Sequence, residues 1–209
     1  ISKRICYKVF LVLERQSEVE LVLREDDALG FLQQMGIRIK LNHEVSGNWA
    51  ASSGDRSTFG MSIAQVIDVI DALRARNYLD CLKLQHSHLG SQVPNIIEIR
   101  IAAQEACRLF VEISREGAPL EFLDLGGGLG VDYTGEHRAA ENSTNYTLSE
   151  YCLNIVETVR YAMDEAEMPH PVIITESGRS CVAQSSMLLF NVLEATRYDS
   201  PEPVWAHPG

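Results

Sequence analysis

The chain has 209 residues, of which 45% are hydrophobic, so it is long enough for one large or two small domains with a buried core. Its 29 acidic and 18 basic residues give a net charge of -11, which argues against nucleic acid or an anionic membrane as the main partner. The 5 cysteines are scattered, without the spacings of a zinc site, and no apolar run reaches the roughly 18 residues of a membrane span. We therefore expect a globular cytoplasmic protein.

Segments typical of strands and helices alternate along the chain. The first half predicts a strand at 8–14, a helix from Ser17 to about Met35, and a strand at 37–41. Ser17 and Glu20 have the spacing of a capping box. A polar stretch, 42–60, then precedes a helix that begins at Ser62. Gln65 is the capping partner there.

The second half continues the same alternation. It predicts a strand at 80–88, a helix from Pro94 to about 116, a strand at 120–125, a polar loop at 132–146, a helix to about 167 capped by Thr147 and Glu150, and a strand at 172–175. Residues 186–194 indicate a further strand that leaves the series, and 199–209 a loop or a cut end.

Five strands separated by helices predict an α/β fold with a parallel sheet, either doubly wound or a barrel. In both, ligands bind at the carboxyl ends of the strands. Three polar clusters follow predicted strands there: HSHLGSQ (86–92), LDLGGGLGVDY (123–133) and ESGR (176–179). The consecutive glycines of the second cluster allow backbone amides to approach an anion closely.

These three clusters, in this order, resemble the biosynthetic arginine decarboxylases, relatives of the ornithine and diaminopimelate decarboxylases. The likeness extends to SGNWAASSGDRSTFG, STNY and PHPVIITESGR, although Thr58 stands where the family usually has Lys, and Ser87 where it usually has Phe. The resemblance implies a pyridoxal phosphate enzyme with a (β/α)8 barrel of the alanine-racemase-like type. About five of the eight units would lie in residues 1–185, and 186–209 would begin a C-terminal β domain or be a cut end.

The resemblance and the chemistry together assign roles to the clusters. A carboxylate facing the cofactor's pyridine nitrogen keeps that nitrogen protonated, and Glu176 is the candidate. Arg179 offers a fork of donors to the phosphate. By resemblance, His88 stacks on the pyridine ring and Ser91 contacts the phosphate. Backbone amides would complete the phosphate site at Gly126, Gly127 and Gly128.

Three positions keep two interpretations each. Asp132 and Tyr133 follow the glycines, and either line the substrate pocket or only form a turn. His86 shares a strand face with His88, so it is either a catalytic residue or a hydrogen-bonded core histidine. No third ligand at a recognised spacing accompanies these histidines, and we predict no metal ligands in the chain.

The predicted function is decarboxylation of L-arginine to agmatine and CO2 in polyamine biosynthesis, with pyridoxal phosphate as the cofactor. Arginine as the substrate follows from the resemblance alone, so diaminopimelate and ornithine stay open as alternatives. Two further alternatives are a Rossmann-type methyltransferase, suggested by Asp124 before the glycines, and a non-catalytic regulatory homologue. The resemblance also implies a homo-oligomer, a dimer or a tetramer of dimers, and possible use of magnesium.

A barrel of this type closes with eight strands, and only five are predicted here. We expect three more upstream, together with the lysine that binds the cofactor covalently in the resembled family. A cysteine and an aspartate of the shared substrate site would lie beyond Gly209. None of the four lysines follows the family's motif, so we expect the 209-residue chain alone to decarboxylate nothing. These lysines are Lys3, Lys8, Lys40 and Lys83.

Overall fold

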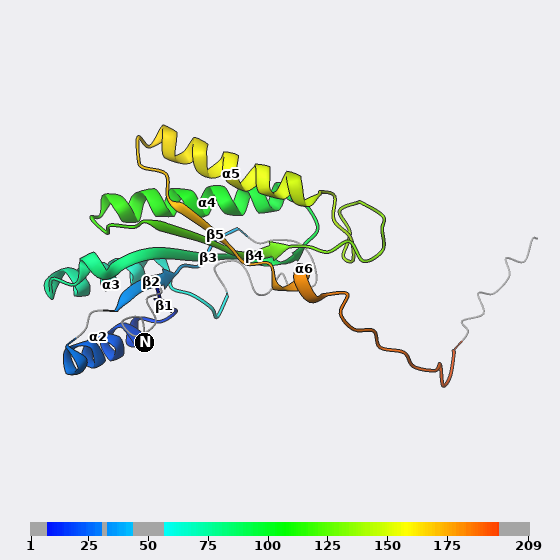
Figure 1. The fold of residues 1–209 in the computed structure, drawn as a ribbon, viewed down its shortest axis with the longest axis horizontal. Helices are drawn as coiled ribbons and strands as arrows, with labels where there is room; N and C mark the ends of the chain where they lie inside the picture. The colour runs from blue at the N-terminus through cyan, green and yellow to red at the C-terminus, as the bar shows by residue number, and fades with distance from the viewer. Residues whose placement is uncertain (1–7, 31–32, 44–56, 197–209) are drawn as a thin grey trace, which may run out of the picture.

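The computed structural model describes residues 8–30, 33–43 and 57–196. Within them, one parallel sheet has the strand order β1-β2-β3-β4-β5, which confirms the predicted α/β fold (Figure 1). The strands are β1 (Phe10–Leu13), β2 (Gln34–Arg38), β3 (Leu82–Val93), β4 (Phe122–Leu129) and β5 (Val172–Thr175). The helices are α2 (Gln16–Leu29), α3 (Ile63–Ala75), the 3-10 turn η2 (Leu79–Cys81), α4 (Ile96–Arg115), α5 (Leu148–Glu165) and α6 (Gly178–Val182).

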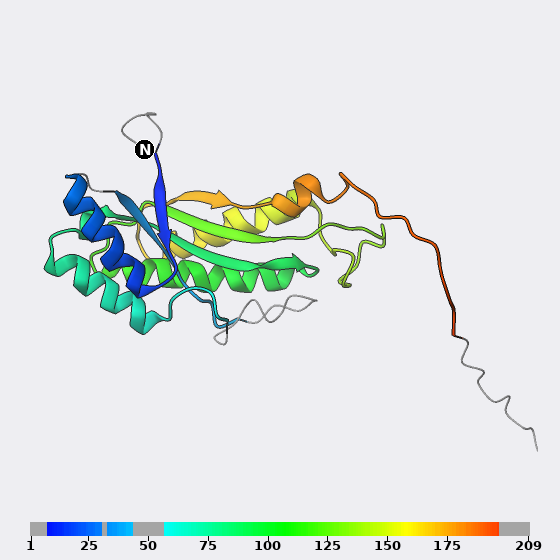
Figure 2. The same ribbon diagram turned by 90° about the horizontal axis from the view of Figure 1, so that it is seen from below.

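The strands lie side by side in the order of the sequence. A doubly wound sheet reverses its order at a switch point, and this reversal is what creates its nucleotide-binding crevice. The sequential order, with every neighbouring pair parallel, is instead that of a barrel wall. Right-handed crossovers then place every connecting helix on the same face of the sheet, and Figure 2 shows α2 to α5 there. The methyltransferase alternative is therefore wrong.

The two faces of the sheet have different environments. The face toward the helices holds the apolar core, in one cluster around Phe110 and Leu123 under α4 and α5, and another around Ile37 and Leu73 under α2 and α3. Each fully buried side chain of this kind stabilises the fold by about 1.5–3 kcal/mol. The opposite face, which would be the barrel interior, carries the Phe10 and Phe122 rings with their centroids 4.8 Å apart. None of the described helices is long and apolar enough to cross a membrane.

Two of the three predicted capping boxes are confirmed. Gln65 N donates to Ser62 Oγ at 3.4 Å, and the Gln65 side chain accepts from Ser62 N at 2.9 Å; Thr147 and Glu150 pair in the same way. The third prediction is wrong, because α2 begins one residue before Ser17. The Glu18 carboxylate accepts the backbone N–H groups of Glu14 and Arg15 instead of Glu20 capping Ser17.

Several predicted boundaries are corrected. Helix α2 ends at Leu29 rather than near Met35, because Gly30 adopts a φ of +60° and Met35 is a fully buried residue of β2. Strand β2 lies three residues earlier than predicted, and β3 starts two residues later but runs to Val93. Strand β4 continues through the glycines to Leu129. Helix α4 begins at Ile96, capped by Asn95, rather than at Pro94.

The predicted strand at 186–194 is wrong. Residues 186–196 form no regular element, and the side chains of Leu189 and Leu193 are 82% and 97% exposed. A strand needs a neighbour to which its backbone can hydrogen-bond, and the described part of the chain offers none to this segment. The predicted tail at 199–209 and most of the polar stretch 42–60 lie outside the described residues.

Candidate functional site

The polar clusters meet at the carboxyl end of the sheet. The register of β3 and β4 pairs His86 with Asp124 and His88 with Gly126. Neighbours in register on parallel strands point to the same face, so these side chains lie on the face opposite the helices. Glu176 follows the last residue of β5 and reaches the same place, with its carboxylate Oε1 3.5 Å from His86 Nε2. Residues from three strands therefore converge as predicted.

The first two glycines provide room for the two histidines. A Cβ atom at Gly126 would overlap His86 Nε2 and lie 3.2 Å from the Glu176 carboxyl carbon. A Cβ at Gly127 would lie 2.5 Å from His88 Cε1, and Gly127 has a φ of +68° that other residues rarely adopt. Both imidazoles thus lie against bare backbone. The glycines are required by this side-chain packing as well as by any ligand.

Burial lowers the basicity of both histidines. Desolvation is the main cause that lowers the pKa of His86 to about 4, against the opposing attraction of Glu176. Desolvation and the positive charge of Arg38 lower the pKa of His88. Both rings are therefore neutral near pH 7. Each can donate or accept one hydrogen bond there without carrying a positive charge.

Glu176 lies between a buried and an open environment. Its side chain is 53% exposed, whereas its neighbours His86 and Asp124 are each 7% exposed as residues. Ligand atoms of these three residues all lie within 4.8 Å of one another. Burial and the nearby Glu176 charge raise the pKa of Asp124 to about 7. One face of Glu176 is thus held by buried polar groups while the other is free to meet a ligand.

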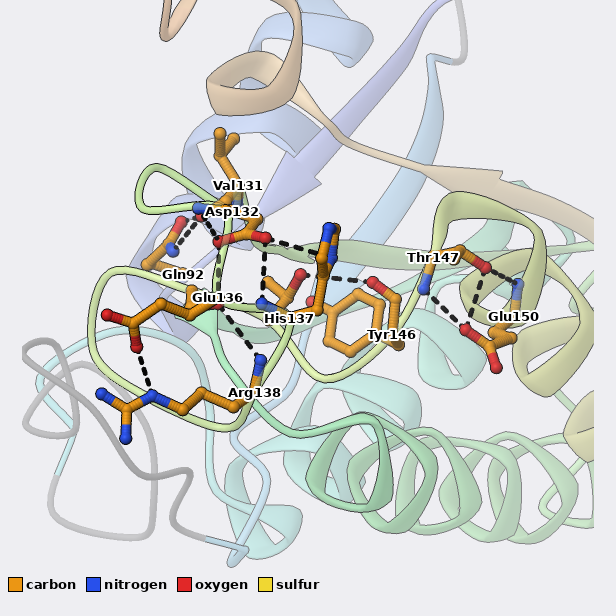
Figure 3. A network of polar contacts seen from close by, with 12 residues as sticks. Gln92, Val131, Asp132, Glu136, His137, Arg138, Tyr146, Thr147 and Glu150 are labelled. Atoms are coloured by element: carbon orange, nitrogen blue, oxygen red, sulfur yellow. Dashed lines mark hydrogen bonds and ion pairs between the residues drawn. The ribbon is translucent and has the colours of Figure 1, made fainter.

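A set of hydrogen bonds ties the ends of β3 and β4 together (Figure 3). The Gln92 side-chain amide donates to Val131 O at 2.7 Å and accepts from Val131 N at 2.9 Å. The Tyr146 hydroxyl accepts from Gly130 N at 2.9 Å and donates to Val93 O at 2.8 Å. These bonds hold the segment after the glycines against the end of β3, where Ser91 also lies.

Asp132 organises its own loop (Figure 3). Its carboxylate accepts hydrogen bonds from Ser143 Oγ at 2.7 Å and Gly135 N at 2.9 Å, and lies 3.1 Å from His137 Nδ1. The bond from Ser143 is the largest of the causes that lower the pKa of Asp132. These contacts are those of the turn-forming interpretation. The substrate-binding role of Asp132 stays a prediction.

Arg179 and Tyr133 meet beside the glycines. Arg179 lies in the first turn of α6, and its Nη1 donates to the Tyr133 hydroxyl at 3.2 Å. Next to this contact, α6 and the end of β4 enclose a cleft of about 580 Å³, lined by Gly130, Asp132 and Cys181 among others. Tyr133 is 45% exposed. Asp132 and Ser180, the chain neighbours of these two residues, line the cleft, so the Arg179 guanidinium and the Tyr133 phenol lie near an open space.

Sequence reasoning missed one member of the site, Asp124. It was considered only as a methyltransferase motif, although a charged residue inside the apolar run 120–125 was a signal that it faces something polar. The cluster of His86, Asp124 and Glu176 was also not foreseen, because its members come from three strands whose register the sequence does not display. Magnesium prefers six oxygen ligands, so an imidazole nitrogen and two carboxylates make a poor cage for it.

Comparisons with known proteins agree with this geometry. A family model described as pyridoxal-dependent decarboxylase, pyridoxal binding domain, matches residues 4–183. A biosynthetic arginine decarboxylase from Vibrio vulnificus is 45% identical over 204 residues, which cover 98% of this chain and 32% of the relative. One from Neisseria meningitidis is 40% identical over 208 residues, covering 97% and 33%. The chain therefore spans about a third of the length of the curated relatives it matches.

Solved structures of related enzymes have the same fold. The biosynthetic arginine decarboxylase of Campylobacter jejuni matches with a TM-score of 0.70 and 26% identity, over 84% of this chain and 28% of that one. A diaminopimelate decarboxylase of Helicobacter pylori, complexed with L-lysine, matches with a TM-score of 0.67 and 25% identity, over 84% and 41%. The family resemblance predicted from the motifs is thereby confirmed. The chain belongs to the pyridoxal-dependent decarboxylases, and its residues 4–183 match the pyridoxal binding domain of that family.

Proposed function

We propose that the protein carrying this chain decarboxylates L-arginine to agmatine with pyridoxal phosphate, and that the site at the carboxyl end of the sheet holds the cofactor. The observation that carries the proposal is the position of Glu176, a half-exposed carboxylate at the carboxyl end of the sheet. The buried, neutral His86 lies next to it, at 3.5 Å. A carboxylate so placed is suited to accept the N–H of a pyridinium ring.

The residues present fit this cofactor. The backbone at Gly127 and Gly128, both at positive φ, leaves amides free of side chains beside His88. A flat imidazole against bare backbone presents a surface on which an aromatic ring can stack. Arg179 precedes Ser180, which lines the adjoining cleft, and supplies a cation of the kind that a phosphate dianion needs. We therefore assign His88 and Glu176 to the ring, and Ser91, Arg179 and the glycines at 126–128 to the phosphate.

The protein's part in the chemistry is electrostatic. When bound, the protonated pyridine ring withdraws the electron pair left when a carboxylate departs as CO2. Glu176 keeps the proton on the ring nitrogen, and His88 limits movement of the ring. Tyr133 holds the Arg179 guanidinium by a 3.2 Å hydrogen bond and so fixes where the phosphate lies. Asp132 and Tyr133 stay predicted substrate-binding residues, and Asp132 also braces its own loop.

Arginine as the substrate is supported by the names of the curated relatives at 40–45% identity. Structures named for diaminopimelate decarboxylation match almost as well in fold, so the fold does not choose between the two substrates. Several further points stay predictions. They are the barrel part at 1–185, the start of another domain at 186–209, a homo-oligomer, the use of magnesium and a cytoplasmic location. A substrate panel of arginine, ornithine and diaminopimelate, assayed with the full-length protein, tests the choice.

Glu176→Gln tests the site. We expect kcat of the full-length protein to fall by about 100-fold or more, because a charge aimed at the reacting centre is removed. The matched control is Glu121→Gln, which removes a carboxylate at the opposite end of the strands, where Glu121 pairs with Lys83 at 2.9 Å. A Glu176→Gln enzyme within threefold of the control would refute the assignment. Failure of the wild-type protein to bind pyridoxal phosphate would indicate the non-catalytic alternative.

A further inference from the structure

Asp124 is a buried acid that has no ion-pair partner among the described residues. It lies within β4 between Leu123 and Leu125, and only 7% of its surface is exposed. Its Oδ1 atom is buried without a hydrogen-bond partner among the described residues. A fully ionised carboxylate in such a place would leave charge without solvent or a cation. We therefore expect the Asp124 carboxyl group to carry less than a full negative charge in the folded protein.

In the part of the chain that the structure describes, the groups that face Asp124 offer it no cation. Its register neighbour His86 is neutral, for the reasons given above, and Glu176 brings a second negative charge. Further away on the same face, Arg38 of β2 is paired with Glu14 at 3.1 Å, and His88 is neutral near pH 7. Two adjacent carboxylates without a cation between them cannot both ionise readily. One proton shared by the pair removes the repulsion and creates a donor.

We propose that Asp124 is a positioning residue, which keeps a proton and donates it in a hydrogen bond to Glu176, so that Glu176 bears the negative charge and is held toward the cofactor nitrogen. The inference rests on the proposed function and deepens it. Asp124 is the member of the pair that keeps the proton, because it is 7% exposed whereas the Glu176 side chain is 53% exposed. Burial penalises the ionised form more strongly than partial exposure does.

The raised pKa of Asp124, about 7, agrees with this geometry, and burial is its first cause. Its other causes are the charge of Glu176 and a hydrogen bond between the two side chains. Such a bond needs a proton on one of the two carboxyl groups. With Asp124 as the donor and His86 Nε2 3.5 Å from its Oε1, the Glu176 carboxylate has two buried polar neighbours that limit its movement.

The first experiment detects the proton directly in the full-length protein without cofactor. At about pH 5.5, above the ordinary aspartate pKa of about 3.9, infrared spectra with isotope-labelled aspartate should contain a protonated carboxyl band. The band should disappear in Asp124→Asn. In Glu176→Gln it should titrate at lower pH, because a neighbouring charge has been removed. Absence of the band from the wild type, or its persistence in Asp124→Asn, would overturn the proposal.

The second experiment separates hydrogen-bond donation from simple packing. Asp124→Asn keeps an N–H donor of similar shape, so its affinity for pyridoxal phosphate and its kcat should stay within about threefold of wild type. Asp124→Leu fills the space without a donor, and should lose about tenfold or more in kcat, the scale of one hydrogen bond to a charged group. Equal losses in the two variants would mean that Asp124 has only a structural role.

A matched control is available in Glu105 of α4. This acid is also buried, 8% exposed, but its two oxygens accept hydrogen bonds from Asn42 N and His43 N at 2.9 and 3.0 Å, so both have partners. Glu105→Gln should leave the protonated band and the cofactor affinity unchanged. The infrared result is obtained on the apoprotein. It would therefore stand if the protein failed to bind pyridoxal phosphate, and the two failures are distinguishable.

Discussion

Removal of the Tyr146 hydroxyl should loosen the segment that follows the glycines. This hydroxyl accepts from Gly130 N and donates to Val93 O, and the residue is 7% exposed. Burial raises the pKa of Tyr146 to about 12, so the hydroxyl keeps the proton that it donates. Tyr146→Phe preserves the ring and removes both hydrogen bonds. It thus deprives one backbone donor and one backbone acceptor of their partner.

The magnitude follows from those two backbone groups. A buried polar group left without a partner costs about 1–3 kcal/mol. The bond to Val93 is buried but the bond from Gly130 is only partly buried, so water can partly replace the second, and the loss for the pair should be roughly 2–4 kcal/mol. The neighbouring Tyr151 is a matched control, with its ring centroid 6.4 Å from that of Tyr146. Tyr151 is 3% exposed, and its hydroxyl is buried without a partner among the described residues. Tyr151→Phe should therefore be neutral or slightly stabilising.

The assay is urea unfolding of the full-length variants together with amide hydrogen exchange in the segment 126–133. At about 1.4 kcal/mol per factor of ten, a local loss of 2–4 kcal/mol corresponds to exchange roughly 30- to 700-fold faster at Gly130 if it opens locally. If Tyr146→Phe and Tyr151→Phe differ by less than about 0.5 kcal/mol and exchange alike, the hydroxyl does not brace this segment.

Three further predictions concern the phosphate, the loop and the lysines. Arg179→Ala should weaken binding of pyridoxal phosphate by about tenfold or more but hardly affect pyridoxal, and Gly127→Ala should weaken both by crowding His88; equal losses of both ligands in Arg179→Ala would mark Arg179 as structural. The pKa of Asp132 is lowered in the folded protein, so its stabilisation of the loop is complete above the ordinary aspartate pKa and is lost as pH falls through the folded-state pKa. Asp132→Asn should therefore speed proteolysis of the loop at neutral pH, and the difference from wild type should shrink in acid. Borohydride reduction with cofactor should leave Lys83 unmodified, because Lys83 pairs with Glu121 at the amino end of the strands; peptide mapping would detect the contrary.

The sequence predicted the order and type of the five strands because each apolar run is short and bounded by capping or turn residues. Boundaries were less predictable. The second strand was placed at 37–41, yet Gly36 packs against Leu84 in the sheet and draws the strand earlier. At 186–194 the pattern was that of a strand, but strand formation depends on a neighbouring strand that local sequence cannot supply.

The site was predictable where a motif carried it and unpredictable where packing did. Glu176, His88 and the glycines could be predicted to lie together because each follows an apolar run at the same end of the sheet, and the structure brings them together there. The pairing of buried Asp124 with half-exposed Glu176 depends on the register of β4 with β5, which pairs Asp124 with Ile174, two residues before Glu176. The Tyr146 brace depends on a loop that folds back across 53 residues to Val93.

His86 packs closely over Gly126, and His88 over Gly127, so substitutions in these two motifs, which are distant in the sequence, are coupled. A methyl group at position 126 would be tolerated only if the side chain at position 86 became smaller, since Gly126 has an ordinary backbone and the His86 imidazole is the main obstruction, ahead of the Glu176 carboxyl carbon at 3.2 Å. At position 127 no smaller neighbouring side chain would make room, because the positive φ and the Gly90 carbonyl oxygen at 2.8 Å both exclude a Cβ. A library that varies 86 and 126 together should thus recover folded combinations that single substitutions never reach, whereas position 127 should return glycine in every background.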